Sequence, residues 1–193
     1  MAGSTETEIK FRVKTLKALE AKLRQLGFRL AHRRAREMNV LYDFPSRELT
    51  KRGELLRLRQ YGDKWKLTHK AKGRIGKHKS RMETESYLAD GPALEAIFAS
   101  LGLVPTFRYE KFRAEWSDGN GHVVVDETPI GNFAEIEGPA EWIDETAQKL
   151  GVKESDYITM NYAGLFMQWK HETGSAVNEM TFAAIKPTKR TSE

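Results

Sequence analysis

The chain has 193 residues, enough for one domain, with 39% apolar residues, 31% charged residues and a net charge of +5. The absence of cysteine from the sequence excludes disulfides, thiolate metal sites and a cysteine nucleophile. The sequence contains no run of about 18 apolar residues and no signal-peptide core, so we expect a cytoplasmic protein without a membrane partner.

Basic and acidic residues are separated along the chain. Residues 64–81 hold eight Lys or Arg and no Asp or Glu, whereas residues 114–148 hold nine Asp or Glu and no Lys or Arg. A basic protein suits polyanionic partners, either nucleic acid or phosphorylated small molecules. A protein that only binds nucleic acid has no need of the acidic block, whereas a site for a polyanion and divalent cations needs both signs.

Alternation of polar and apolar residues predicts eight short strands, because successive side chains of a strand point to opposite faces. Tight turns rich in Gly, Asn, Asp and Pro join several of them, and Asp118-Gly119-Asn120-Gly121 is the strongest hairpin signal. The predicted strands are, in chain order, 5–13, 28–42, 54–61, 65–70, 81–88, 104–116, 122–128 and 133–138.

Helices are predicted between these strands by apolar residues at helical spacing and by glycine stop signals. Residues 71–79, with two glycines and four Lys or Arg, predict a mobile basic loop. Residues 171–193 predict a polar C-terminal tail after a main domain of residues 1–170. The predicted helices and helical turns are 15–26, 46–52, 90–101, 139–150 and 157–170.

The charged faces of the strands carry the functional argument. For any single strand a solvated face is the simpler interpretation. However, six strands repeat the pattern, a seventh adds Asp126, and most opposite faces are apolar and can pack on outer helices. We therefore predict an α+β fold, an eight-stranded antiparallel β-barrel (tunnel) with helices packed outside. The charged sets are Glu6, Glu8 and Lys10; Arg57 and Arg59; Lys66 and Lys70; Arg81, Glu83 and Glu85; Lys111 and Arg113; and Glu135 and Glu137.

A charged barrel interior is costly unless its charges are compensated. Clustered Arg and Lys suit a ligand with several phosphates, because guanidinium groups match phosphate oxygens. Pairs of carboxylates without cysteine suit the hard cations Mg²⁺ or Mn²⁺. A polyphosphate together with divalent cations indicates phosphoryl or nucleotidyl transfer.

The ordered set of motifs resembles the CYTH superfamily, or triphosphate tunnel metalloenzymes, which includes class IV adenylyl cyclases, thiamine triphosphatases and inorganic triphosphatases. The resemblance begins at Glu6-x-Glu8-x-Lys10 and spans about residues 5–165. Met38 and Asn39 stand where cyclase-like members carry Gln and Asp, which weakens the case for a nucleoside-specific cyclase. The other matching segments are 41–45, 53–59, 66–70, 81–85, 109–113, 125–127 and 131–138.

The resemblance implies a tunnel, open at both ends, that binds a triphosphate with one or two Mg²⁺ or Mn²⁺ ions. It implies catalytic roles for Lys10 and Glu8. The phosphate-binding residues that it implies are Lys10, Arg57, Arg59, Lys66, Lys70, Lys111 and Arg113. The metal-binding residues that it implies are Glu6, Glu8, Glu83, Glu85, Asp126, Glu135 and Glu137.

Three functions stay open at this point. The first is metal-dependent hydrolysis of a small-molecule triphosphate such as ATP, thiamine triphosphate or tripolyphosphate. The second is the class IV adenylyl cyclase reaction, which converts ATP to cyclic AMP and pyrophosphate. The third is a non-catalytic phosphate- or RNA-binding module, which the acidic block argues against, so we do not expect a nucleic-acid partner. A homodimer is suggested by the resemblance alone.

Overall fold

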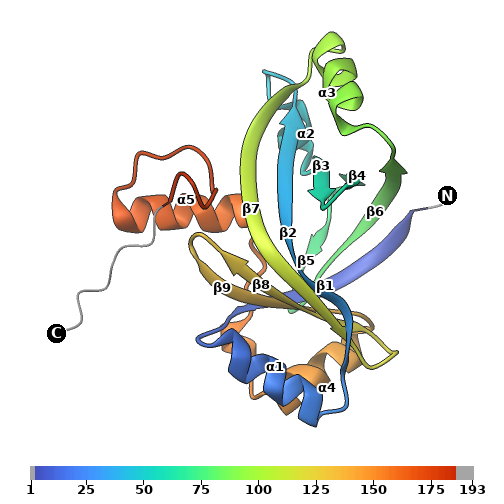
Figure 1. The fold of residues 1–193 in the computed structure, drawn as a ribbon, viewed down its shortest axis with the longest axis vertical. Coiled ribbons are helices and arrows are strands. Elements are labelled where there is room, and N and C mark those ends of the chain that lie inside the picture. The colour runs from blue at the N-terminus through green and yellow to red at the C-terminus, as the bar shows by residue number, and fades with distance from the viewer. Residues whose placement is uncertain (1–2, 186–193) are drawn as a thin grey trace.

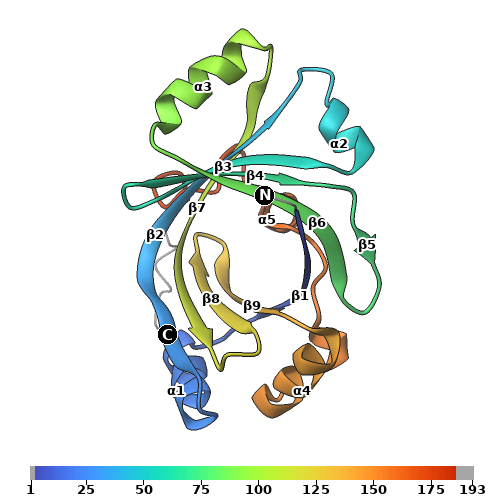
Figure 2. The same ribbon diagram turned by 90° about the vertical axis from the view of Figure 1, so that its right-hand side faces the viewer.

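A closed barrel forms the centre of the computed structural model, which describes residues 3–185 (Figure 1). Nine strands form one antiparallel sheet, and pairing between β1 and β6 closes eight of them into a ring (Figure 2). The short β5 pairs with β6 outside this ring, so the predicted eight-stranded barrel is confirmed. The strands are β1 (Ser4–Arg12), β2 (Arg29–Asp43), β3 (Leu55–Tyr61), β4 (Lys64–Lys70), β5 (Arg74–Ile75), β6 (Lys79–Leu88), β7 (Val104–Ser117), β8 (His122–Thr128) and β9 (Gly131–Glu137).

The helices of the described chain lie outside the barrel wall (Figures 1 and 2). Two of them, α1 and α4, pack on one side, α2 and α3 lie beyond the opposite side, and α5 lies at one end. Together with the strands, this arrangement confirms the predicted α+β class. The helices are α1 (Leu16–Gln25), α2 (Glu48–Arg52), α3 (Gly91–Ser100), α4 (Ala140–Leu150) and α5 (Tyr162–Thr173), with a 3-10 turn at Glu154–Asp156. None of these helices is long and apolar enough to cross a membrane.

Outward-facing apolar residues of the strands build the core between barrel and helices. Ile9 and Phe11 of β1 pack with Leu23 of α1 and Ile143 of α4, and all four are buried. Because side chains alternate, this packing turns the intervening Lys10 into the barrel. Burial of each such apolar side chain contributes about 1.5–3 kcal/mol, which is how the outer core stabilises a charged interior.

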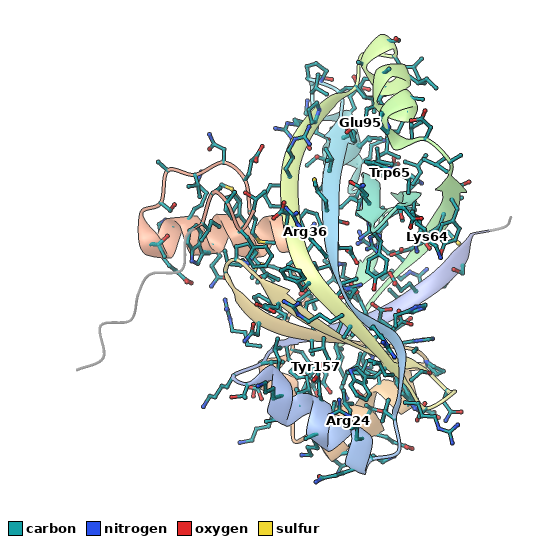
Figure 3. The ribbon with its side chains drawn as sticks, viewed as in Figure 1. Arg24, Arg36, Lys64, Trp65, Glu95 and Tyr157 are labelled. Carbon is teal, nitrogen blue, oxygen red and sulfur yellow. The ribbon has the colours of Figure 1, made fainter. Side chains whose placement is uncertain are left out.

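The same outer core continues around the barrel through aromatic contacts. The guanidinium of Arg24 on α1 lies over the ring of Trp116 at 4.7 Å from its centre. Tyr157 packs against this cluster from the segment before α5 (Figure 3). A second cluster, which includes Phe133, Tyr162 and Phe166, joins β9 to α5 at the end of the barrel. The core thus fixes both the wall of the barrel and the helix that lies across one end.

Asp43, within one of the matching segments, has a structural role. Its carboxylate accepts hydrogen bonds of 2.8–2.9 Å from the backbone N–H groups of Phe44, Leu49 and Thr50, and one of 2.7 Å from the Thr50 hydroxyl. Burial raises the pKa of Asp43, but these hydrogen bonds outweigh burial and leave the pKa below its usual value. Asp43 therefore supplies acceptors for free N–H groups of α2 and fixes the turn after β2.

The basic segment 71–79, predicted as a mobile loop, contacts the rest of the protein in two places. Arg74 and Ile75 pair with Ser80 and Lys79 in a short hairpin. Farther along, Lys77 donates a 2.9 Å hydrogen bond to Asp144 on α4, and Nε2 of His78 lies 2.8 Å from the same carboxylate. Sequence periodicity could not reveal this contact, because its partners lie more than 60 residues apart.

Replacing Asp144 by Asn is expected to release residues 72–78 while the barrel stays folded. Burial raises the pKa of Asp144, but hydrogen bonds from Lys77 and His78 lower it by a larger amount, so its net pKa is below the usual value. The stabilisation is therefore present at neutral pH and is lost only as the pH falls through this lowered pKa. Hydrogen exchange should become faster in peptides covering 72–78, with little change in Tm because the pair is surface-exposed.

The matched control for this prediction is Glu145→Gln on the same helix. Glu145 pairs only with the exposed Lys149 among the described residues, so its loss should leave exchange in 72–78 unchanged. Unchanged exchange in the Asp144→Asn variant would show that this carboxylate does not hold the segment.

The last helix begins later than the predicted 157–170 and continues to Thr173. The Asn161 side chain accepts a 2.9 Å hydrogen bond from Gly164 N–H and thereby caps α5. Just before it, Ile158 donates its N–H to the Lys10 carbonyl at 2.7 Å, which keeps this stretch extended along β1. Within the predicted polar tail, Met180 is buried against α5 and pairs with β7. Residues 186–193 lie outside the described chain, and the domain boundary at residue 170 stays a prediction.

Candidate active site

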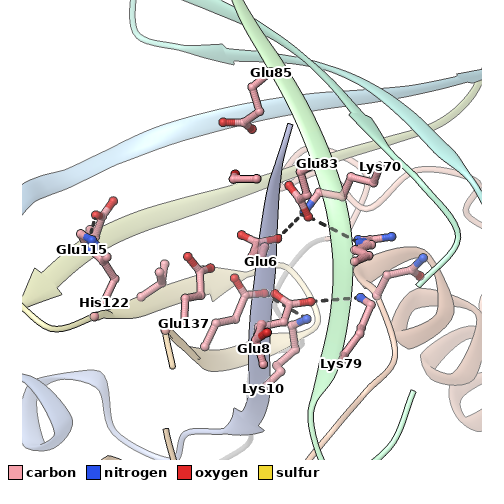
Figure 4. A pocket seen from close by; sticks show the side chains of 18 of the residues that line it. Glu6, Glu8, Lys10, Lys70, Lys79, Glu83, Glu85, Glu115, His122 and Glu137 are labelled. Carbon is pink, nitrogen blue, oxygen red and sulfur yellow. Dashed lines mark hydrogen bonds and ion pairs between the residues drawn. The ribbon is translucent and has the colours of Figure 1, made fainter. Parts of the chain in front are cut away.

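A cavity of about 740 Å³ lies inside the barrel (Figure 4). Its wall is built from the inward-facing side chains of the strands, as the alternation predicts. Figure 2 looks along the ring of strands, with α5 behind it. Asp126 is the one predicted site residue that does not line the cavity. The predicted residues that do are Glu6, Glu8, Lys10, Arg57, Arg59, Lys66, Lys70, Glu83, Glu85, Lys111, Arg113, Glu135 and Glu137.

The predicted phosphate-binding cations come from β1, β3, β4 and β7 and converge in the cavity. Two of them are deeply buried, with Lys111 1% exposed and Lys10 3% exposed. Glu135 is the counter-charge of Lys10 and Arg113, 3.0 Å from the Lys10 ammonium and 2.5 Å from the Arg113 guanidinium. Burial raises the pKa of Glu135, but Lys10 and Arg113 hold it well below its usual value, so Glu135 stays ionised.

Asp126 lies on the inner face of β8, fully buried beneath Lys111, Arg113 and Tyr162. Its carboxylate accepts hydrogen bonds from Lys111 at 3.0 Å, from Arg113 at 2.6 Å and from the Tyr162 hydroxyl at 2.6 Å. These three donors occupy much of its capacity as an acceptor. The position therefore favours anchoring of the two cations over the metal binding that the resemblance implies.

Three other carboxylates form a cluster on the wall made by β1 and β9. One oxygen from each of Glu6, Glu8 and Glu137 lies within 4.8 Å of the others. Glu8 is 3.0 Å from Lys79, whereas Glu137 makes no ion pair with any residue of the described chain. Burial and the neighbouring Glu6 raise the pKa of Glu137 well above its usual value. An all-oxygen donor set that repels itself without a cation fits Mg²⁺ or Mn²⁺.

The remaining predicted acids face this cluster from β6. Burial and the neighbouring Glu6 raise the pKa of Glu83 to about 7, although Lys70 opposes this rise. Burial raises the pKa of Glu6, but Glu83 and Lys70 lower it by a larger amount, so its net pKa is below the usual value. Glu85 instead accepts hydrogen bonds of 2.9 Å from Lys66 and from the Thr68 hydroxyl. Lys70 also contacts Glu83. Each of the two β6 carboxylates, Glu83 and Glu85, is therefore paired with a lysine that is predicted to bind phosphate.

Two buried guanidinium groups carry donors without partners. The Nε atoms of Arg57 and Arg81 are inaccessible and make no hydrogen bond with residues 3–185, although Arg81 Nε lies 3.5 Å from a Glu83 oxygen as an ion pair. A buried N–H without an acceptor costs about 1–3 kcal/mol, and more when the group is charged. Both residues line the cavity, so an anion with several oxygens could supply the missing acceptors.

A buried carboxylate that the sequence analysis did not select lies among these cations. Glu37 of β2 is 1% exposed, and its oxygens lie 3.2 Å from Arg59, 3.6 Å from Lys111 and 3.7 Å from Arg113. Burial raises the pKa of Glu37, but the three cations lower it by a larger amount. The net pKa is below its usual value, so Glu37 remains charged. The Asn39 amide donates to Glu37 at 3.1 Å. The consecutive charges Arg36 and Glu37 obscure the alternation of β2, which is why the pattern did not single out Glu37.

The conserved-domain comparison matches the CYTH domain over residues 4–162. The chain belongs to the CYTH family. This confirms the resemblance drawn from the motifs, and the match covers all of the barrel strands. CYTH proteins are in general enzymes that bind a triphosphate in such a tunnel. A search of curated proteins found no match.

Solved structures show the same CYTH fold. A candidate adenylate cyclase from Vibrio parahaemolyticus has TM-score 0.76 and 21% identity, over 86% of this chain and 99% of that chain. A conserved hypothetical protein from Pyrococcus furiosus has TM-score 0.71 and 26% identity, over 83% and 99%. A candidate adenylyl cyclase from Hippeastrum, described as having a dominant triphosphatase activity, has TM-score 0.61 and 13% identity, over 90% and 97%. The likenesses below 25% identity show the fold alone.

Several residues that line the CYTH tunnel were not selected from the sequence. Alternation already placed Arg81 on the charged face with Glu83, but no site role was assigned to it. Lys79 shares this face and could have been found in the same way. Tyr162 carried no such signal, because it reaches the cavity from the start of α5. The other lining residues outside the predicted set include Tyr109, Glu115, His122 and Asn161.

Proposed function

We propose that the protein is a Mg²⁺- or Mn²⁺-dependent enzyme that hydrolyses a triphosphate. The observation that carries this proposal is a closed barrel in which cations from four strands face a cluster of three carboxylates. Such an interior suits a ligand that brings both negative charge and a divalent cation. The CYTH family, whose members in general bind triphosphates, supports the same conclusion.

The basic side chains would bind and orient the phosphate chain. Arg57 and Arg81 have buried donors to spare, and Arg59, Lys70 and Arg113 surround the same cavity. Guanidinium groups match phosphate oxygens in pairs, and their ion pairs with Glu37 and Glu135 hold them in place beforehand. Catalysis would then rest on positioning and charge neutralisation.

Glu6, Glu8 and Glu137 would hold the divalent cation, with Lys79 orienting Glu8 from the side. When bound, the cation would supply an activated water and charge neutralisation at the phosphate oxygens. Burial lowers the pKa of Lys10, but Glu135 and Glu8 outweigh burial and raise it above its usual value. Lys10 therefore stays protonated and would act as a cation toward the phosphates, with its ammonium fixed 3.0 Å from Glu135.

The second candidate is the class IV adenylyl cyclase reaction. It would use the same basic residues, but the ribose 3′-hydroxyl of ATP would attack the α-phosphate and pyrophosphate would leave. Similar structures include candidate adenylate cyclases from Vibrio parahaemolyticus and Bacillus halodurans. We keep hydrolysis first because water as the nucleophile is the less demanding chemistry. The Hippeastrum protein, which shares the fold, is described as having a dominant triphosphatase activity.

One assay separates these functions. The purified protein is incubated with Mg²⁺ or Mn²⁺ and, in parallel, with ATP, thiamine triphosphate and tripolyphosphate. We expect release of phosphate from at least one of them, and loss of this activity when the cation is chelated. Formation of cyclic AMP and pyrophosphate would support the cyclase instead. No turnover of any substrate, combined with tight RNA binding, would refute the enzyme proposal.

A further inference from the structure

A second, smaller cavity of about 180 Å³ adjoins the tunnel at the rim formed by the β3–β4 hairpin. It shares Arg59 and Arg113 with the main cavity, so the same predicted phosphate-binding residues border both cavities. Its volume is below the 300–1,000 Å³ of complete ligand pockets, so it suits one part of a ligand whose remainder lies in the tunnel.

The outer end of this cavity is lined by Tyr61 and Tyr87. Tyr87 lies on the inner face of β6 and is 70% exposed, so its ring is accessible to a ligand in this cavity. Lys66 lies over its ring at 5.5 Å from the centre. The Tyr61 hydroxyl donates a 3.0 Å hydrogen bond to the Arg33 carbonyl, which fixes the second ring at the rim.

Strand pairing places these rings at a definite distance from the tunnel cations. Tyr87 pairs with Lys66 across β6 and β4, and Lys66 pairs with Arg59 across β4 and β3. Two strand spacings amount to about 10 Å. A sugar between a phosphate chain and a planar ring can span such a gap, so a phosphate chain at Arg59 can lie in the tunnel while the ring reaches Tyr87.

The charge of the lining favours a neutral ring over a cationic one. Four Lys or Arg side chains and two Glu side chains line the small cavity, which gives a difference of two positive charges. One of these cations, Lys64, lies at the rim (Figure 3). A neutral nucleobase stacks on tyrosine without electrostatic cost, whereas the surplus of Lys and Arg side chains in the lining would repel a permanently cationic ring.

We propose that this cavity binds the base of a nucleoside triphosphate, with Tyr87 as the stacking surface, and that the tunnel thereby selects nucleotides over tripolyphosphate and thiamine triphosphate. This inference rests on the proposed triphosphate-binding function of the tunnel and adds the class of substrate. Any nucleobase can stack on an aromatic ring. The site would therefore favour ligands that carry a base, but it would not distinguish one base from another.

The test is calorimetric titration of the full chain, in Mg²⁺, with a non-hydrolysable ATP analogue, with tripolyphosphate and with thiamine triphosphate. The wild type should bind the analogue more tightly than the other two ligands. Tyr87→Ala should weaken binding of the analogue about tenfold, the loss of one base–aromatic contact, and leave tripolyphosphate binding within about twofold. Tyr87→Phe keeps the ring and should bind like the wild type.

The matched control is Met82→Ala on the same strand, since Met82 is exposed on the outer face and should affect no ligand. Equal weakening of the analogue and of tripolyphosphate in Tyr87→Ala would overturn the base site. Equal affinity of the wild type for both ligands would also overturn it, yet would leave the triphosphate function standing. Failure of the wild type to bind any of the three ligands would instead refute the proposed function itself.

Discussion

Replacing Glu8 by Gln is expected to reduce kcat on the order of 100- to 1,000-fold while the barrel stays folded. The substitution keeps the shape of the side chain but removes one of the three clustered carboxylates that would hold the divalent cation. Glu8 is 12% exposed and pairs with Lys79, so loss of its charge also leaves that ammonium without its 3.0 Å partner. Phosphate release at saturating Mg²⁺ or Mn²⁺ measures the effect, and circular dichroism reports the fold.

Two further variants complete this test. Glu127→Gln makes the same chemical change on β8, where Glu127 pairs with the exposed Arg34, and should keep the wild-type rate. Arg59→Ala removes a guanidinium from the opposite wall of the tunnel and should also abolish turnover. If both Glu8→Gln and Arg59→Ala keep the wild-type rate, the tunnel is not the active site.

Replacing Glu37 by Ala is expected to lower the free energy of unfolding by about 3–5 kcal/mol, because removal of one partner leaves buried charges uncompensated. Glu37 is the shared counter-charge of Arg59, Lys111 and Arg113, and Lys111 is 1% exposed. Denaturant unfolding measures the loss. The same change adds one positive charge to the tunnel, so tripolyphosphate should bind the variant more tightly than the wild type.

Ligand stabilisation separates this charge effect from ordinary destabilisation. Saturating tripolyphosphate should raise the Tm of Glu37→Ala by more than it raises that of the wild type, because the ligand replaces the lost negative charge. Leu58→Ala provides the control, since Leu58 is buried on the outer face of β3 and its truncation costs about 2–5 kcal/mol without changing charge. An equal ligand-induced shift in both variants would show that Glu37 contributes packing and not charge balance.

The composition of the tunnel wall could be predicted because alternation is a local property. Ile9 and Phe11 have to face an apolar core, so Lys10 between them has to face inward, whatever the rest of the chain does. The same reasoning placed Arg57 and Arg59, Lys111 and Arg113, and Glu135 and Glu137 in one cavity. Alternation failed at Glu37, where neighbouring charges hide the period, and at Tyr162, which lies on a helix.

The sequence by itself determined the eight barrel strands, the face on which most of their charges lie and the signs that meet inside. The tertiary structure decided which charges become partners, because register and ring closure depend on contacts between distant residues. Pairing of β1 with β9 brings Glu137 opposite Glu8, whereas Asp126 is covered by Lys111 and Arg113, which are its partners. Period-two alternation assigns a side chain to a face, but only the closed barrel assigns it a neighbour, and the neighbour determines whether a carboxylate anchors a cation of the protein or is left to bind a metal.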